Sequence, residues 1–82
     1  MTCTVRIDRA NMGPLYVNCA TYAEGRRVYD KIIEQMHESK PWTLVEVRFE
    51  YISDGNEVTE EHAVPARIIR DVALVTSEDM VR

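Results

Sequence analysis

The side chains best suited to chemistry are two cysteines and two histidines. Cys3 and Cys19 lie opposite each other if residues 3–7 and 15–19 form a hairpin, so a cross-strand disulfide or redox switch is one interpretation. In a reducing cytosol, two small thiols on a core face are instead ordinary packed side chains. We favour the second interpretation, because two cysteines are too few for the disulfide framework of a small secreted domain.

The sequence gives little support for metal binding or catalysis. The cysteines and histidines are widely spaced and form no C-x-x-C or H-x-x-x-H motif, so we expect no metal. His62 and Glu60 could form a proton-transfer pair, which leaves a small enzyme or ligand-binding protein as one alternative. No motif places a nucleophile beside them, and the three glycines form neither G-x-G-x-x-G nor a Walker loop. We therefore predict a protein that is not an enzyme and has no cofactor.

The size and composition of the chain predict one folded domain. The 82 residues are 45% hydrophobic and 29% charged, which is typical of a packed domain. We expect that domain over residues 1–76 and a frayed tail over residues 77–82. No segment approaches the roughly 20 apolar residues that span a bilayer, and the N-terminus lacks the apolar core of a signal peptide. These features predict a cytoplasmic protein with no membrane partner.

The charge of the chain argues against direct binding of nucleic acid. Ten lysines and arginines stand against fourteen aspartates and glutamates, for a net charge of −4. Affinity for phosphates comes mainly from cationic side chains, which are in the minority here. The acidity is concentrated in residues 42–82, which hold nine acidic and four basic residues.

Hydrophobic alternation predicts an N-terminal hairpin followed by a helix. Residues 3–7 and 15–19 alternate as strands, with a register that pairs Cys3 with Cys19. Thr21-Tyr22-Ala23-Glu24 is a capping box, so we expect a helix from about Tyr22 to Ser39. Gly25 lies on its apolar stripe, which suggests close approach of the helix to a sheet. The predicted stripe contains Tyr22, Gly25, Tyr29, Ile32, Ile33 and Met36.

The second half of the chain predicts another hairpin. Residues 42–52 alternate, Asp-Gly at positions 54–55 favours a type I′ turn, and residues 57–64 form the partner strand. After Pro65, a helical stripe competes with a single turn followed by a strand over Val72–Thr76, and we favour the turn and strand. The expected fold is α+β, with order ββαβββ: about five strands in one mostly antiparallel sheet and one helix packed on one face.

Two surfaces of the second hairpin are candidates for binding a partner. Its outer face would carry an acidic ribbon with Arg48 as the only base and Asp54 at the tip, and such a face would steer a basic partner. The alternative is a face that carries glutamate only for solubility. Trp42 and Leu44 would form an apolar patch at the other end of the face. The acidic ribbon consists of Glu46, Glu50, Glu57 and Glu61.

These surfaces predict a non-catalytic protein-binding module or inhibitor whose acidic face engages a basic protein partner. Such a face could imitate nucleic acid phosphates, so a nucleic-acid-binding protein is one such partner. In general character, a small acidic domain without catalytic motifs resembles phage-encoded inhibitors of host nucleic-acid-binding machinery. A homodimeric structural or regulatory subunit is the other alternative, because so small a core gains stability from a second copy.

Overall fold

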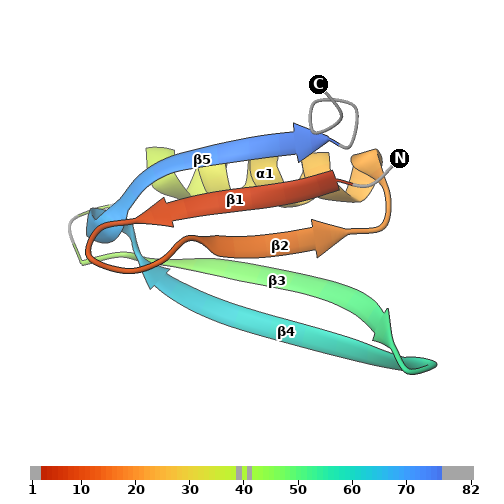
Figure 1. Cartoon of the computed structure of the whole chain (residues 1–82). Helices are drawn as coiled ribbons and strands as arrows, with labels where there is room; N and C mark the ends of the chain where they lie inside the picture. Colours follow the sequence, from red (N-terminus) through yellow and green to blue (C-terminus); the bar gives the residue numbers. More distant parts are fainter. Residues whose placement is uncertain (1–2, 39, 41, 77–82) are drawn as a thin grey trace.

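The computed structural model describes residues 3–38, 40 and 42–76. The predicted α+β class and ββαβββ order are confirmed (Figure 1). The tail predicted at residues 77–82 lies outside the described residues, as do residues 1–2 of the predicted domain. In chain order, the elements are β1 (Cys3–Arg9), β2 (Leu15–Cys19), α1 (Tyr22–His37), β3 (Leu44–Ser53), β4 (Asn56–Pro65), the single 3-10 turn η1 (Ala66–Ile68) and β5 (Ile69–Thr76).

One sheet contains three antiparallel strands in the order β2-β1-β5. The predicted register of β1 and β2 is confirmed, including the pair formed by Cys3 and Cys19. The turn and strand predicted after Pro65 are also confirmed, because η1 is followed by β5, which pairs with the other edge of β1. β5 begins at Ile69, three residues before the predicted Val72, because the 3-10 turn takes up only three residues.

The helix begins at the predicted capping box. The Glu24 N–H donates to Thr21 Oγ1 at 3.2 Å, which satisfies one of the amides left without a partner in the first turn. The helix ends at His37 rather than at Ser39, because Glu38 is its C-cap. Ser39 itself lies outside the described residues.

The buried face of α1 differs from the predicted stripe. Gly25, Val28 and Ile32 are buried, whereas Tyr22 is 45% exposed. Val28 and Ile32 lie three and seven positions after Gly25 and therefore share its side of the helix. The face that α1 turns to the core is thus narrower than the predicted stripe. The prediction omitted Val28, and it was wrong to place Tyr22 in the core.

The second hairpin forms a sheet of its own, in which β3 pairs with β4. A two-residue turn at Asp54-Gly55 predicts that Tyr51 pairs with Val58 and Val45 with Val64, and both pairs are confirmed in a register that runs from Leu44 and Pro65 to Ser53 and Asn56. Asp54 has φ of 52° and Gly55 has φ of 79°, as a type I′ turn requires. The strand begins at Leu44, so that Trp42 lies in the preceding turn rather than in the strand.

The five strands are divided between two sheets, where the sequence predicted one. β2 and β3 run in the same direction and contact each other, but no backbone hydrogen bond joins them within the described residues (Figure 1). The side-chain amide of Gln35 bonds to the edge of β3 instead. The Glu46 N–H donates to Gln35 Oε1 at 2.8 Å, and Gln35 Nε2 donates to the Glu46 carbonyl at 2.8 Å. An amide side chain offers the donor and acceptor of a peptide group, so it satisfies the strand edge as another strand would.

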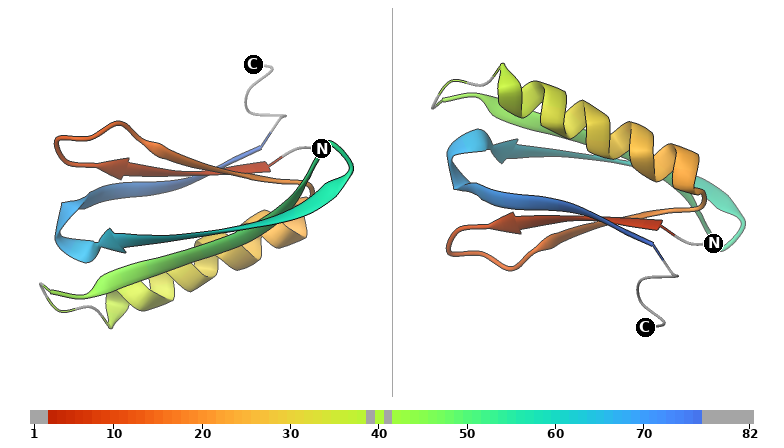
Figure 2. Two further views of the ribbon diagram at one scale, coloured as in Figure 1. Left: turned by 90° about the horizontal axis from the view of Figure 1, so that it is seen from below. Right: turned by 90° about the horizontal axis from the view of Figure 1, so that it is seen from above.

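The core lies where the two sheets and the helix meet. α1 and the β2-β1-β5 sheet lie on opposite sides of it, with β3 next to α1 (Figure 2). Within the described residues, no helix combines the length and the apolar character that crossing a membrane requires. The buried cluster contains Cys3, Val5, Ile7, Val17, Cys19, Val28, Ile32, Val45, Val47 and Phe49.

We predict that Gly25→Ala destabilises the protein. A Cβ at position 25 would overlap Cys3 Sγ and lie 3.1 Å from Cys3 Cβ, which confirms the predicted close approach of helix and sheet. Alanine normally stabilises a helix by about 1 kcal/mol relative to glycine, but overpacking a core costs about 1–3 kcal/mol. Because the Cβ would overlap the buried Cys3 side chain, we expect an overpacking cost at the upper end of this range and a net fall of about 2 kcal/mol in the free energy of unfolding in urea.

Gly13→Ala is the matched control, because a Cβ at position 13 meets no atom within 4 Å. A Gly25→Ala protein as stable as the control would show that α1 does not depend on this close approach.

Candidate functional site

The second hairpin places the predicted acidic side chains on one exposed face. Glu46 and Glu50 lie on β3, and Glu57 and Glu61 lie on β4; all four are exposed. They share a face because the register pairs Glu50 with Thr59. The even-numbered residues of β3 therefore point the same way as the odd-numbered residues of β4. Asp54 is exposed in the turn that joins the strands.

This face is not uniformly acidic, although the sequence suggested a ribbon with one base. Arg48 Nε lies 3.6 Å from Glu61 Oε1, so these charges compensate each other. Arg27 and Lys31 of α1 line a groove of about 620 Å³ together with Glu46 and Arg48. The middle of the hairpin therefore faces cations that the hairpin pattern alone did not show.

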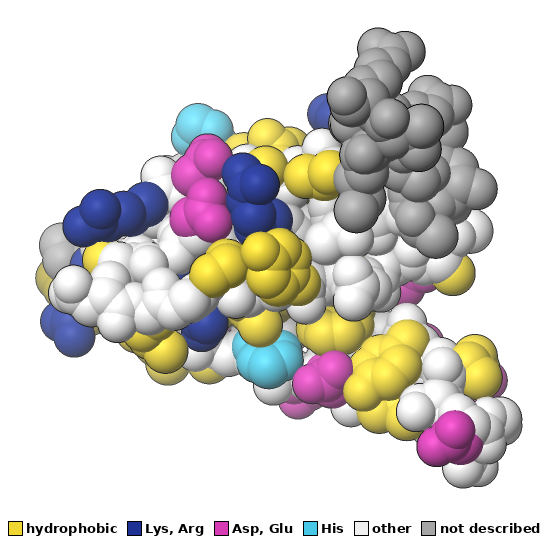
Figure 3. Space-filling view, viewed as in Figure 1, with side chains coloured by type: hydrophobic (Ala, Val, Ile, Leu, Met, Phe, Trp, Pro, Cys, Tyr) yellow, Lys and Arg dark blue, Asp and Glu magenta, His cyan; other side chains and the backbone are white. Residues whose placement is uncertain are grey.

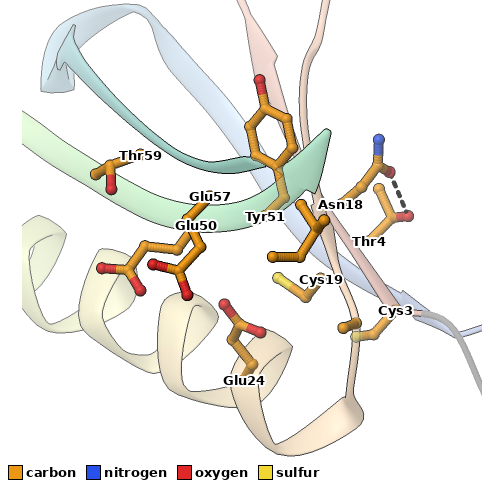
Figure 4. A pocket seen from close by; sticks show the side chains of 11 residues that line it. Cys3, Thr4, Asn18, Cys19, Glu24, Glu50, Tyr51, Glu57 and Thr59 are labelled. Atoms are coloured by element: carbon orange, nitrogen blue, oxygen red, sulfur yellow. Dashed lines mark hydrogen bonds between the residues drawn. The ribbon is translucent and has the colours of Figure 1, made fainter. Parts of the chain in front are cut away.

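Nearer the Asp54-Gly55 turn, the carboxylates of the hairpin share their groove with no described basic side chain. Glu50 and Glu57 line a groove of about 830 Å³ together with Glu24 from the first turn of α1, and the three carboxylates point into the same space (Figure 4). Among residues 3–38, 40 and 42–76, no lysine, arginine or histidine lines this groove, which we call the acidic groove. Its lining residues are Cys3, Thr4, Asn18, Cys19, Ala20, Glu24, Glu50, Tyr51, Ile52, Glu57 and Thr59.

Exposed apolar side chains lie beside these carboxylates. Ile52 is 67% exposed and Tyr51 is 37% exposed, and both line the acidic groove. The projecting end of the hairpin shows hydrophobic and acidic side chains together (Figure 3). A surface that combines exposed apolar area with one sign of charge suits a partner that carries apolar groups and the opposite charge.

Trp42 and Leu44, the predicted apolar patch, are exposed, and Leu44 lies at the predicted end of the hairpin, away from the acidic groove. Trp42 is 75% exposed, and Lys40 Nζ lies 5.8 Å from the centroid of its ring. Leu44 is 55% exposed and pairs with Pro65 at the opposite end of β3 from Ile52. A strand rises by about 3.3 Å per residue, so the stretch of β3 from Leu44 to Glu50 and Ile52 separates this patch from the acidic groove by roughly 20–26 Å. The structure does not bring the two predicted surfaces together.

The two cysteines form one wall of the acidic groove as free, buried thiols. Burial raises the pKa of Cys3. Burial, together with the nearby Glu24 and Cys3, raises the pKa of Cys19 from its ordinary value of 9.0 to about 11, against the opposing effect of Arg27. Both side chains are therefore held as neutral thiols, which are poor nucleophiles and poor metal ligands.

His62 and Glu60 are neighbours, as the sequence suggested, but they do not line either groove described above. His62 Nε2 lies 3.4 Å from Glu60 Oε1, and the His62 ring stacks on Phe49 with centroids 6.0 Å apart. A hydrogen bond to Glu60 raises the pKa of Tyr51. Among the described residues, no group of three or more His, Cys, Asp and Glu side chains is arranged to hold a metal ion.

Sequence reasoning missed two residues of this surface. Glu24 was read only as part of the capping box, although its carboxylate lines the acidic groove. Gln35 carries no charge and belongs to no motif, so no sequence signal could have placed it on the edge of β3.

We predict that Cys19 makes the protein less stable as the pH rises from about 9 to about 11. Below pH 9 its thiol is protonated in both the folded and the unfolded chain. Between its ordinary pKa of 9.0 and its folded value of about 11, the unfolded chain loses the proton first, so the free energy of unfolding decreases. Urea titrations across this range should show a shallower decrease for Cys19→Ala than for the wild type; equal slopes would contradict the raised pKa.

Comparisons with protein-family models, with curated proteins and with solved structures found no match for this chain. The function therefore has to be inferred from the chemistry of the surfaces described above. Among them, the acidic groove combines a concave shape, one sign of charge and exposed apolar side chains.

Proposed function

We propose that the protein is a non-catalytic binding module that engages a basic surface of a protein partner at the acidic groove. The observation that carries this proposal is the convergence of Glu24, Glu50 and Glu57 on a groove that no basic side chain lines in the part of the chain that the structure describes. Carboxylates gathered in a concave site focus a negative potential, which accelerates association with a cationic partner and selects against acidic ones.

The acidic groove supports this role better than the hairpin face as a whole. Arg48 neutralises Glu61, and Arg27 and Lys31 lie across from Glu46, so the middle of the face attracts cations weakly. Ile52, which is 67% exposed, supplies apolar area at the groove, and burial of that area would provide affinity beyond electrostatic steering.

A nucleic-acid-binding protein is the kind of partner that this chemistry fits. Such a protein presents clustered lysines and arginines to phosphates, and carboxylates at the end of a narrow hairpin can occupy that surface instead. The module would then act as an inhibitor of its partner. The cytoplasm is the compartment we propose, because two buried thiols that face each other are expected to stay reduced there.

We predict that reversing the charge of the acidic groove abolishes capture of the partner. Tagged protein would be incubated with its native lysate at low and high salt, and the retained proteins would be identified by mass spectrometry. We expect a basic protein that is retained at low salt and lost at high salt. Glu50→Lys with Glu57→Lys should reduce its capture at least tenfold. A tenfold weaker affinity corresponds to a loss of about 1.4 kcal/mol in the free energy of binding.

Glu34→Lys with Asp71→Lys is the control, because these exposed residues lie outside the acidic groove and give the same change in net charge. Equal loss in the control would mean that net charge alone matters, and unchanged capture by the groove variant would overturn the proposal.

The exposed Trp42 and Leu44 favour a homodimer as a second candidate function. A tryptophan that is 75% exposed leaves a large apolar area in water, and a second copy of the chain would cover it. This candidate uses a different end of the hairpin from the acidic groove.

We predict that sedimentation at tens of micromolar distinguishes this candidate. A dimer in the wild type, and a monomer in Trp42→Ser with Leu44→Ser, would support it. Met12→Ser is the control, since Met12 is 56% exposed in a different part of the molecule. A monomeric wild type would exclude the dimer.

A further inference from the structure

Within the described residues, the edge of β3 next to the acidic groove has unpaired backbone groups. Both backbone groups of Glu46 bond to Gln35, so they point away from β4. In an antiparallel pair, residues alternate between facing the partner strand and facing away from it. The register of β3 and β4 runs without a shift, so Glu50 and Ile52 share the orientation of Glu46.

No strand occupies this position in the part of the chain that the structure describes. β3 pairs with β4, and β2 contacts β3 without hydrogen bonding to it. The N–H and C=O groups of Glu50 and Ile52 therefore form a strand edge beside a groove that both residues line. An unpaired edge of this kind is a template for another extended chain.

We propose that this edge accepts an extended, basic segment of the partner as an added strand. The inference rests on the proposed function and specifies how the partner is recognised. Main-chain bonds to Glu50 and Ile52 would hold the segment, as in other cases of strand addition. Its side chains alternate between the two faces, so every second one meets Glu24, Glu50 and Glu57.

Charge complementarity identifies the occupant. The described lining of the groove contains three carboxylates and no cation, so the side chains on that face of the added strand are lysine or arginine. The alternate side chains lie on the face of Phe49 and Tyr51, whose rings are 6.0 Å apart, and are therefore apolar. The matching segment alternates basic and apolar residues.

The outer edge of β4 is a poorer template. Residues 57, 59, 61 and 63 turn their backbone groups outward there by the same alternation. Pairing of two copies along this edge would bring Glu57 and Glu61 of one copy against those of the other, and like charges opposite each other destabilise a strand pair.

The test uses a fluorescein-labelled hexapeptide of alternating lysine and valine, with binding measured by fluorescence anisotropy. We expect it to bind the wild type, and a peptide of alternating glutamate and valine to bind at least tenfold more weakly. Glu50→Gln with Glu57→Gln should also weaken binding at least tenfold, whereas the control Glu34→Gln with Asp71→Asn should not change it.

Two further peptides separate strand addition from simple charge attraction. One is N-methylated on its lysine amides and the other on its valine amides, so both keep the full charge. An added strand turns only alternate amides to β3, so one peptide should lose binding at least tenfold and the other should not. Equal binding by both, or equal loss in both, would overturn the proposal.

Amide hydrogen exchange measured by NMR gives an independent readout. The bound lysine–valine peptide should slow exchange at the amides of Glu50 and Ile52 at least tenfold and leave Tyr51, whose amide faces β4, unchanged. Binding without this protection would also overturn strand addition. Because the lysate experiment makes no use of strand pairing, capture that depends on Glu50 and Glu57 would leave the proposed function standing.

Discussion

The hydrogen bonds between the Gln35 side chain and the backbone of Glu46 determine how the two sheets meet. They attach α1 to the edge of β3 and satisfy the backbone groups of Glu46 as a neighbouring strand would. From this point toward the turn, the hairpin diverges from β2, as Figure 1 shows. The divergence leaves the β3 edge unpaired at Glu50 and Ile52 and opens the acidic groove beside it. The edge of β3 is therefore hydrogen-bonded at Glu46, by the Gln35 side chain, and open at Glu50 and Ile52.

The side of α1 that faces β3 also sets the charge along the hairpin. Glu24, Arg27, Lys31 and Gln35 are spaced by three or four residues, so they form one stripe along the helix. Arg27 and Lys31 face the middle of β3 and offset its glutamates, whereas Glu24 adds a third carboxylate at the far end. The negative charge therefore accumulates at the groove rather than along the whole hairpin, and this is also where Cys19 is held as a thiol.

Local patterns predicted most of the fold. Alternation with a period of two and the Asp54-Gly55 turn determined both hairpin registers, and the Thr21 cap determined the start of α1. These features depend on residues close in sequence, so the sequence alone contains them. The division into two sheets is accompanied by Gln35 reaching Glu46, and the acidic groove depends on Glu24 of α1 facing Glu50 and Glu57. Such contacts arise from packing and leave no pattern in the sequence.

The central claim is that negative potential is concentrated in the acidic groove. It can be tested without a partner by measuring the NMR relaxation of backbone amide protons in the presence of a cationic nitroxide and of a neutral nitroxide of the same size. A cation accumulates where the potential is negative. We expect the ratio of the two effects to be largest at Glu50, Ile52 and Glu57 and smaller at Glu46 and Glu61. A ratio that is uniform along the hairpin, or largest at Glu46 and Glu61, would contradict it.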